Sequence, residues 1–100
     1  MKPVELHPSA KSELIDSIDW YNQEEPGLGY EFYDLVIEHI KRIHIFPEMW
    51  PDIYDGVRRL PVKKYPYSIL YQELEDKFFI FAIMHDARKP LYWVDRVSDK

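Results

Sequence analysis

The sequence contains no cysteine, which excludes a disulfide framework, thiolate metal ligands and a cysteine nucleophile. Glycine is scarce too, with 3 among 100 residues, and no glycine-rich phosphate-binding loop occurs. Also missing are a His-Glu-x-x-His metal motif, a serine nucleophile elbow and a calcium-binding loop. The histidines, at positions 7, 39, 44 and 85, are not spaced as ligands of one metal ion. We therefore expect neither a metal site nor a cofactor.

Long hydrophobic runs are also absent. The longest, residues 78–84, is far shorter than the ~20 apolar residues of a transmembrane helix. The first residues lead into a mixed sequence and not into an apolar signal segment. Hydrophobic residues make up 46% of the chain, which is enough for a packed core. We expect a single domain over residues 1–100, located in the cytoplasm and without membrane contact.

The net charge of −5 differs from the basic charge of a general nucleic-acid-binding protein. The charge is unevenly distributed. Residues 1–55 hold 12 acidic and 4 basic side chains, whereas residues 56–100 hold 6 acidic and 9 basic ones. We interpret the acidic residues of the first half as surface charges on helices, and we expect any basic functional surface in the second half.

The N-terminal region predicts a short strand followed by a helix. Residues 4–6 alternate apolar, polar and apolar, and Pro8 and Ser9 then suit a helix start with Ser9 as the cap. Apolar residues recur at spacings of four, four and three on one face of a helix over residues 9–25. They are Ala10, Leu14, Ile18 and Tyr21. Trp20 lies outside this face, and we expect it to pack on a neighbouring helix.

A second helix is predicted over residues 29–46. The Pro-Gly-Leu-Gly sequence at residues 26–29 separates it from the first helix, so the two should form a hairpin. Its apolar face follows a 3.6-residue period. The face consists of Phe32, Leu35, Val36, His39, Ile43 and Phe46. We expect His39 to be a hydrogen-bonded core histidine and His44 to lie on a solvated face.

The rest of the chain predicts short strands separated by turn residues. We expect strands over residues 57–60, 67–72 and 78–84, and a further one over 91–94. Residues 78–84 are apolar without alternation, which favours a central strand buried on both faces. The order of elements predicts an α+β fold, a single two-layer domain with an N-terminal strand, a helical hairpin and an antiparallel β meander. The face of the sheet opposite the hairpin then requires a cover or a partner.

A group of polar and aromatic residues follows the predicted central strand directly. It comprises His85, Asp86, Arg88, Lys89, Tyr92 and Trp93. Because a rigid strand would hold these side chains in place, we interpret the segment as a binding or catalytic rim. Two alternatives remain open. The segment can be a polar turn before an edge strand, and Arg59, Tyr67, His85 and Arg88 can form a buried network that fixes the strands.

Several fragments together resemble a known family. They are Trp20-Tyr21, Pro26-Gly27-Leu28-Gly29 with Phe32, Pro47, Arg59, Tyr65-Pro66-Tyr67-x-Ile69-x-Tyr71 and His85-x-x-Arg88-x-Pro90-x-x-Trp93. In order and spacing they resemble the RelE/ParE superfamily of bacterial type II toxins, over residues 4 to 96. The resemblance implies a toxin of a toxin–antitoxin (plasmid stabilisation, or addiction) module, neutralised by an antitoxin that wraps its sheet and helices.

Members of this superfamily follow one of two mechanisms. RelE-like toxins cleave messenger RNA in the ribosome without a metal ion, and the resemblance then implies a catalytic set of His85, Arg88, Arg59 and Tyr67. Such cleavage needs an acid, a base and cations, for which histidine and arginine are suited. ParE-like toxins bind DNA gyrase, and the target-binding residues would then be Arg59, His85, Arg88, Tyr92 and Trp93.

Two features of the sequence favour the ParE-like mechanism. Ser68 stands where the nuclease members have an arginine, and the chain is acidic where those members are strongly basic. We therefore predict a toxin that binds a target protein such as gyrase. The alternatives are a ribosome-dependent endoribonuclease and a homologue that has lost toxicity and survives as a binding module.

Overall fold

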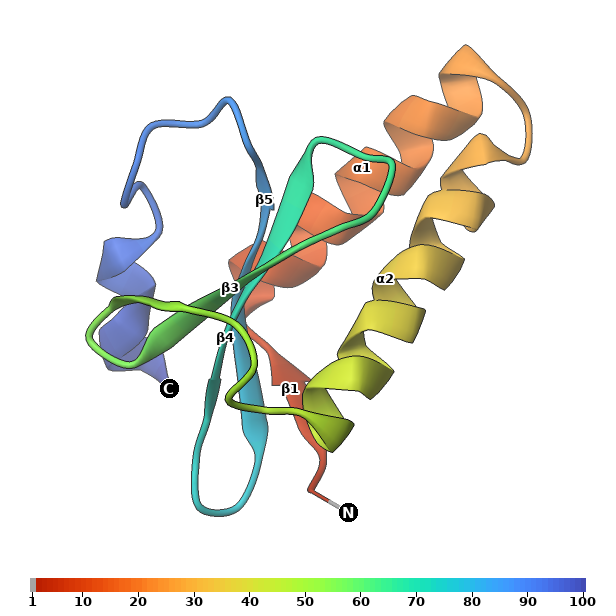
Figure 1. Cartoon of the computed structure of the whole chain (residues 1–100). Coiled ribbons are helices and arrows are strands. Elements are labelled where there is room, and N and C mark those ends of the chain that lie inside the picture. The colour runs from red at the N-terminus through yellow and green to blue at the C-terminus, as the bar shows by residue number, and fades with distance from the viewer. Residues whose placement is uncertain (1) are drawn as a thin grey trace.

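The computed structural model describes residues 2–100. Its elements, in chain order, are β1 (Val4–Leu6), α1 (Pro8–Glu24), α2 (Leu28–Ile45), β2 (Asp52–Tyr54), β3 (Val57–Pro61), β4 (Tyr67–Glu73), β5 (Phe78–His85) and a 3-10 helix, η1 (Val94–Asp99). The strands form one sheet in the order β1-β5-β4-β3-β2, and β1 pairs with β5 in parallel while the other pairs are antiparallel. The predicted α+β fold is confirmed (Figure 1). No helix within the described residues is long and apolar enough to cross a membrane.

The helical hairpin agrees with the prediction to within one residue at each end. The cap of α1 was predicted wrongly, because His7 and not Ser9 precedes the helix, and its Nδ1 accepts a hydrogen bond from the Ser9 backbone at 3.0 Å. At the start of α2, Gly29 lies against α1, where a Cβ atom would be 2.1 Å from the carbonyl oxygen of Ile18. Any larger residue would therefore push the two helices apart.

Strand β5 is buried on both faces, as its uninterrupted apolar sequence predicts. Towards α1 and α2, Ile80 and Ile83 pack in a cluster with Phe32 and Val36 of α2. The opposite face carries a second buried cluster, which consists of Val57, Leu70, Phe79, Phe81, Ala82, Met84 and Trp93. The sheet thus separates two apolar cores, of which only one touches the helical hairpin.

The C-terminal segment covers the second core. Figure 1 shows η1 on the side of the sheet away from α1 and α2, with the loop from β5 leading to it. The predicted strand over residues 91–94 is wrong, because Leu91 has a φ of +61° and the chain then enters η1. The second face of the sheet is therefore covered by the chain's own last residues, and not left open.

Two histidines of α2 lie in different surroundings from each other. His39 is a hydrogen-bonded core residue, as predicted, since Nδ1 lies 2.6 Å from the Leu35 carbonyl and Nε2 accepts from the Lys63 backbone at 3.1 Å. The prediction for His44 is wrong. Its Nε2 donates to the Lys2 carbonyl at 2.9 Å and its ring packs on Phe78, so it joins α2 to the sheet.

The two ends of the predicted apolar face of α2 differ. Phe32 is fully buried, whereas Phe46 is 52% exposed. Phe46 is exposed because α2 ends at Ile45 and the chain turns away at Phe46, where φ is −130°.

The buried tyrosine of β4 makes stability sensitive to alkaline pH. Burial raises the pKa of Tyr71 from 10.0 to about 12, with the charge of Arg58 opposing the shift and that of Glu73 adding to it. Because the folded state holds this proton more tightly than the unfolded chain, the stabilisation is fully present below pH 10 and is lost as the pH rises towards 12. We expect the free energy of unfolding to fall by about 2–3 kcal/mol over that interval on account of Tyr71.

Urea unfolding at several pH values, with the wild type and Tyr71→Phe, measures this contribution. Phenylalanine loses the hydrogen bond from the Tyr71 hydroxyl to the Pro47 carbonyl, so the variant should be less stable at neutral pH by about 1 kcal/mol. It should also show a smaller decline above pH 10. An equally steep decline in both proteins would show that Tyr71 does not cause it.

Candidate functional site

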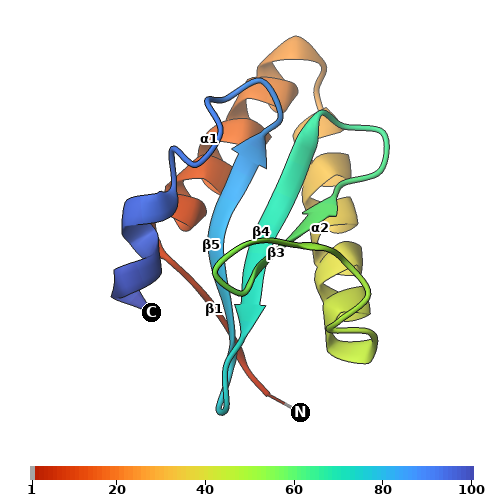
Figure 2. The same cartoon turned by 60° about the vertical axis from the view of Figure 1, so that its left-hand side comes forward.

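The rim segment, residues 85–93, begins where β5 ends and leads from there to η1 (Figure 2). The Asp86 backbone donates to the Pro66 carbonyl at 2.8 Å, and the Arg88 backbone donates to the His85 carbonyl at 3.0 Å. These bonds fix the turn against the loop before β4. The rim segment is therefore anchored to two strands at its start.

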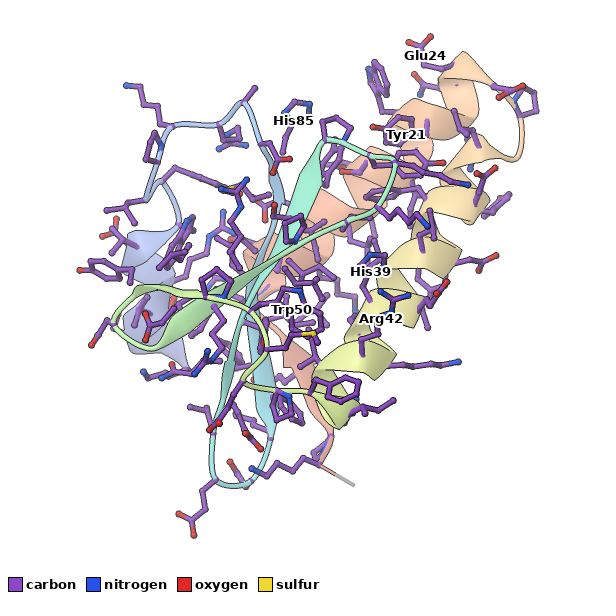
Figure 3. The ribbon with its side chains drawn as sticks, in the orientation of Figure 1. Tyr21, Glu24, His39, Arg42, Trp50 and His85 are labelled. Atoms are coloured by element: carbon purple, nitrogen blue, oxygen red, sulfur yellow. The ribbon has the colours of Figure 1, made fainter. Side chains whose placement is uncertain are left out.

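His85 presents one ring nitrogen away from its protein contacts. The ring is half-buried and stands edge-to-face against Tyr67, with centroids 4.9 Å apart. Its Nδ1 accepts a hydrogen bond from the Ala87 backbone at 3.0 Å. The neutral ring therefore carries its proton on Nε2, which makes no hydrogen bond to any residue from 2 to 100. Figure 3 shows His85 at the same end of the molecule as Tyr21 of α1.

Arg88 carries an available positive charge. Its guanidinium group lies over the ring of Tyr92, 4.0 Å from the centroid, and the residue is exposed. It forms no ion pair with any carboxylate of the described chain. The stacking on Tyr92 holds the side chain in one direction while its N–H groups stay accessible.

Arg59 differs from Arg88, because a carboxylate compensates its charge. The guanidinium of Arg59 donates to the hydroxyl of Ser68 at 3.0 Å and to Oδ1 of Asp86 at 3.1 Å. The Ser68 hydroxyl in turn donates to the same oxygen of Asp86 at 2.8 Å. One alternative was that Arg59 and Arg88 both belong to a network that fixes the strands. Arg59 does belong to a polar group that joins β3, β4 and the rim segment, but Arg88 is not part of that group.

A second polar group, centred on Glu13, holds α1 to the C-terminal segment. Both carboxylate oxygens of Glu13 accept from Arg96, at 2.9 and 3.1 Å, and one also accepts from the Tyr92 hydroxyl at 2.6 Å. Glu13 further accepts from the Ile83 backbone, and Arg96 donates to the Phe81 carbonyl. Glu13 and Arg96 thus provide hydrogen-bond partners for backbone groups of β5 that lie beyond the end of its pairing with β1.

This group was not predicted, because Glu13 was interpreted as a surface charge. Its side chain and that of Arg96 are each 16% exposed. Burial, together with the hydrogen bond to Glu13 and its charge, raises the pKa of the Tyr92 hydroxyl. The only signal in the sequence is a carboxylate one position before the buried Leu14, which does not reveal a partner 83 residues away.

Replacing Glu13 by Ala should lower the free energy of unfolding by about 2–4 kcal/mol. The loss leaves the Arg96 charge, the Tyr92 hydroxyl and the Ile83 N–H without their acceptor in a place that is only partly open to water. Asp16→Ala is the matched control. Asp16 lies one turn along α1, is exposed and makes no side-chain hydrogen bond or ion pair within residues 2–100. It should change stability by less than ~0.5 kcal/mol. Equal effects of the two variants in urea unfolding would contradict the role of Glu13.

Two aromatic residues occupy positions opposite to those predicted. Trp93 is 1% exposed and packs in the second core, with its ring edge-on to Tyr54 at 5.9 Å, so its side chain does not reach the surface. Trp20 was expected to pack on a helix but is 54% exposed. Its ring packs edge-on against the adjacent Tyr21 of the same helix, with centroids 5.1 Å apart.

Two clefts meet at Arg88. The first, of about 270 Å³, lies between α1 and the end of β5, and its lining includes Asp16, Trp20, Tyr67, His85 and Arg88. The second, of about 360 Å³, lies over the other side of the rim segment, and its lining includes Ile53, Arg59, Arg88, Pro90 and Leu91. The structure thus brings His85, Arg88 and Tyr67 to one cleft and places Arg59 in the adjoining one.

Comparison with solved structures identifies the fold. The structure is similar to one described as "Chromosomal ParDE TA system from P. aeruginosa", with a TM-score of 0.74 and 19% sequence identity, over 85% of this chain and 96% of that chain. The chain therefore has the fold of that protein. No curated protein matches the sequence.

Comparison with family models identifies the family. The model described as "ParE toxin of type II toxin-antitoxin system, parDE" matches residues 4–90, which include both helices and all five strands. The chain therefore belongs to the ParE toxin family and is the toxin component of a type II toxin–antitoxin system. The match ends inside the rim segment, so Tyr92, Trp93 and η1 lie beyond it.

Proposed function

We propose that this toxin acts by binding a cellular target protein, with DNA gyrase in the cytoplasm as the expected target. The proposed contact surface consists of His85, Arg88, Tyr92 and the exposed side of Arg59. The observation that supports it best is Arg88, an exposed guanidinium held by an aromatic ring and left without a carboxylate partner in the described chain. Such a group suits a charge-assisted contact with a carboxylate of a partner. Trp93 is omitted from this surface because it is buried.

The endoribonuclease alternative has less support. Stabilising a phosphorane requires cations directed at the phosphate. Of the two arginines in the predicted catalytic set, Arg59 is compensated by Asp86 at 3.1 Å, which leaves Arg88 for this role. Asp16, which forms no ion pair within residues 2–100, lines the cleft beside His85, where an RNA backbone would meet its negative charge. His85 alone, with Nε2 available, provides an acid or a base but not both.

An antitoxin is the second partner that we propose. A groove of about 500 Å³ runs along α1 and the edge strand β1, and it is lined by Val4, Leu6, Leu14, Ile15, Ile18 and Tyr33 among others. Ile15 is 48% exposed and Tyr33 is 40% exposed, so a partner would bury apolar surface here. An amphipathic or extended antitoxin segment fits this groove. Acidic residues of the antitoxin outside the groove would be attracted to the basic second half of the chain.

Inducing the chain in bacteria and examining plasmids and messages from the same cells tests the mechanism. Inhibition of gyrase should leave plasmid DNA less negatively supercoiled while messenger RNA stays intact. Messages cut within the reading frame, with normal plasmid topology, would instead establish the endoribonuclease. A folded chain that arrests neither growth nor supercoiling would establish the non-toxic homologue.

A further inference from the structure

Four aromatic rings surround a hollow between α1 and the ends of β4 and β5. The hollow has a volume of about 400 Å³ and is lined by Trp20, Tyr21, Pro66, Tyr67 and His85, and by no other residue of the described chain. We call it the aromatic hollow. It opens beside the first cleft, with which it shares Trp20, Tyr67 and His85.

The rings stand at steep angles to their neighbours. The ring centroids of Trp20 and Tyr21 are 5.1 Å apart, with an interplanar angle of 84°. For Tyr21 and Tyr67 the distance is 6.1 Å and the angle 64°, and for Tyr67 and His85 they are 4.9 Å and 76°. Pairs at such angles are favourable, because the positive edge of one ring meets the negative face of the other. The aromatic rings that line the hollow therefore have different orientations.

Packing behind the hollow fixes two of its walls. The ring centroid of Tyr21 lies 5.3 Å from that of Phe32 and 5.0 Å from that of Tyr65. The centroids of Tyr67 and Phe32 are 5.0 Å apart. Trp20, in contrast, is 54% exposed and contributes little to the core. The chain thus keeps a large aromatic side chain at the open side of a preformed aromatic site.

Negative charge lies next to these rings. Asp16 is four residues before Trp20 on α1, so the two side chains are neighbours on one helix face. The Asp16 carboxylate lines the first cleft and makes no hydrogen bond or ion pair within residues 2–100. Aromatic faces beside an unpaired carboxylate attract a cation, because the ring quadrupole and the charge act in the same direction.

We propose that the aromatic hollow binds the cationic side chain, an arginine or a lysine, of a segment of the protein partner. The inference rests on the proposed function, because it assigns a recognition chemistry to the same target-binding end of the molecule. Arg88 lines the adjoining first cleft, so the segment would carry a basic residue for the hollow and a carboxylate for Arg88. A nucleobase would also stack on the rings, but its phosphates would meet Asp16.

Titration of the purified chain with N-acetyl-arginine amide, followed by NMR, tests the cation site directly. The arginine probe should bind about tenfold more tightly than N-acetyl-citrulline amide, its neutral analogue of similar shape. Trp20→Ala should weaken binding of the arginine probe about tenfold and Asp16→Asn about threefold. Both residues are exposed, so both variants should fold. Tyr30→Ala, at an exposed ring of α2 outside the hollow, is the control and should change binding less than twofold.

Equal binding of the arginine and citrulline probes, or tighter binding of adenosine monophosphate, would overturn the inference. Toxicity of Trp20→Ala, measured separately by growth, tests the link to the target. Full toxicity in a variant that no longer binds the arginine probe would remove the hollow from target recognition and leave the proposed function standing. Conversely, tight binding of the probe by a wild-type chain that does not inhibit gyrase would support the cation site while the proposed function fails.

Discussion

Replacing Phe81 by Ala is expected to lower the free energy of unfolding by about 3–5 kcal/mol. Phe81 lies in the middle of β5, is fully buried and stands edge-to-face against Phe79 with centroids 4.9 Å apart. Around it lie the other residues of the second core, including Met84 and Trp93. Removing the ring costs its transfer free energy and leaves a cavity that a covered sheet face cannot close. Urea unfolding followed by circular dichroism measures the change.

Phe46→Ala is the matched control for this substitution. Phe46 is also a phenylalanine, but it is 52% exposed at the end of α2, so its removal should cost less than ~1 kcal/mol. If Phe81→Ala were as mild as Phe46→Ala, the C-terminal segment would not be closing a packed core over the sheet.

Replacing Arg88 by Ala is expected to abolish toxicity while the fold stays nearly intact. An exposed arginine that stacks on one ring contributes about 1 kcal/mol or less to stability. A charge-assisted hydrogen bond to a target contributes about 1.5–3 kcal/mol, so its loss weakens target binding at least about tenfold. Growth after induction measures toxicity, and thermal melting of the same variant measures the fold.

The neighbouring cation provides the control for Arg88. Lys89 is also exposed and adjacent in sequence, but it lines neither cleft, so Lys89→Ala should remain toxic. A large fall of the melting temperature in Arg88→Ala would assign Arg88 to the scaffold. Equal toxicity of Arg88→Ala and the wild type would remove it from the target-binding surface.

Elements with a strong periodic pattern could be predicted from the sequence. The sequence of each of these elements shows which of its residues are buried. The helices have a 3.6-residue apolar repeat, and β5 has an uninterrupted apolar run. The segment after Pro90 could not, because apolar residues at 91–94 fit a strand as well as a buried anchor. The positive φ of Leu91 and the packing of Trp93 in the second core exclude the strand. Neither feature can be inferred from the neighbouring sequence. Strand β2 is three exposed residues and carries no pattern.

The candidate site was predicted in part for the same reason. His85 and Arg88 follow directly from the end of β5, so a local argument places both at the rim. The compensation of Arg59 by Asp86 depends on the register of β3 and β4, in which Arg59 faces Leu70 and Pro61 faces Ser68. The exposure of Trp20 depends on the tertiary arrangement around α1. Pairings between distant elements are thus the part that the sequence leaves open.

Supercoiling of relaxed plasmid DNA by purified gyrase, with increasing amounts of the purified chain, tests the proposed mechanism most directly. The wild type and Lys89→Ala should inhibit supercoiling at similar concentrations, and Arg88→Ala should need at least about ten times more. Unchanged supercoiling with the folded wild type in excess, together with cleavage of messenger RNA on ribosomes by the same preparation, would contradict target binding and establish the nuclease mechanism.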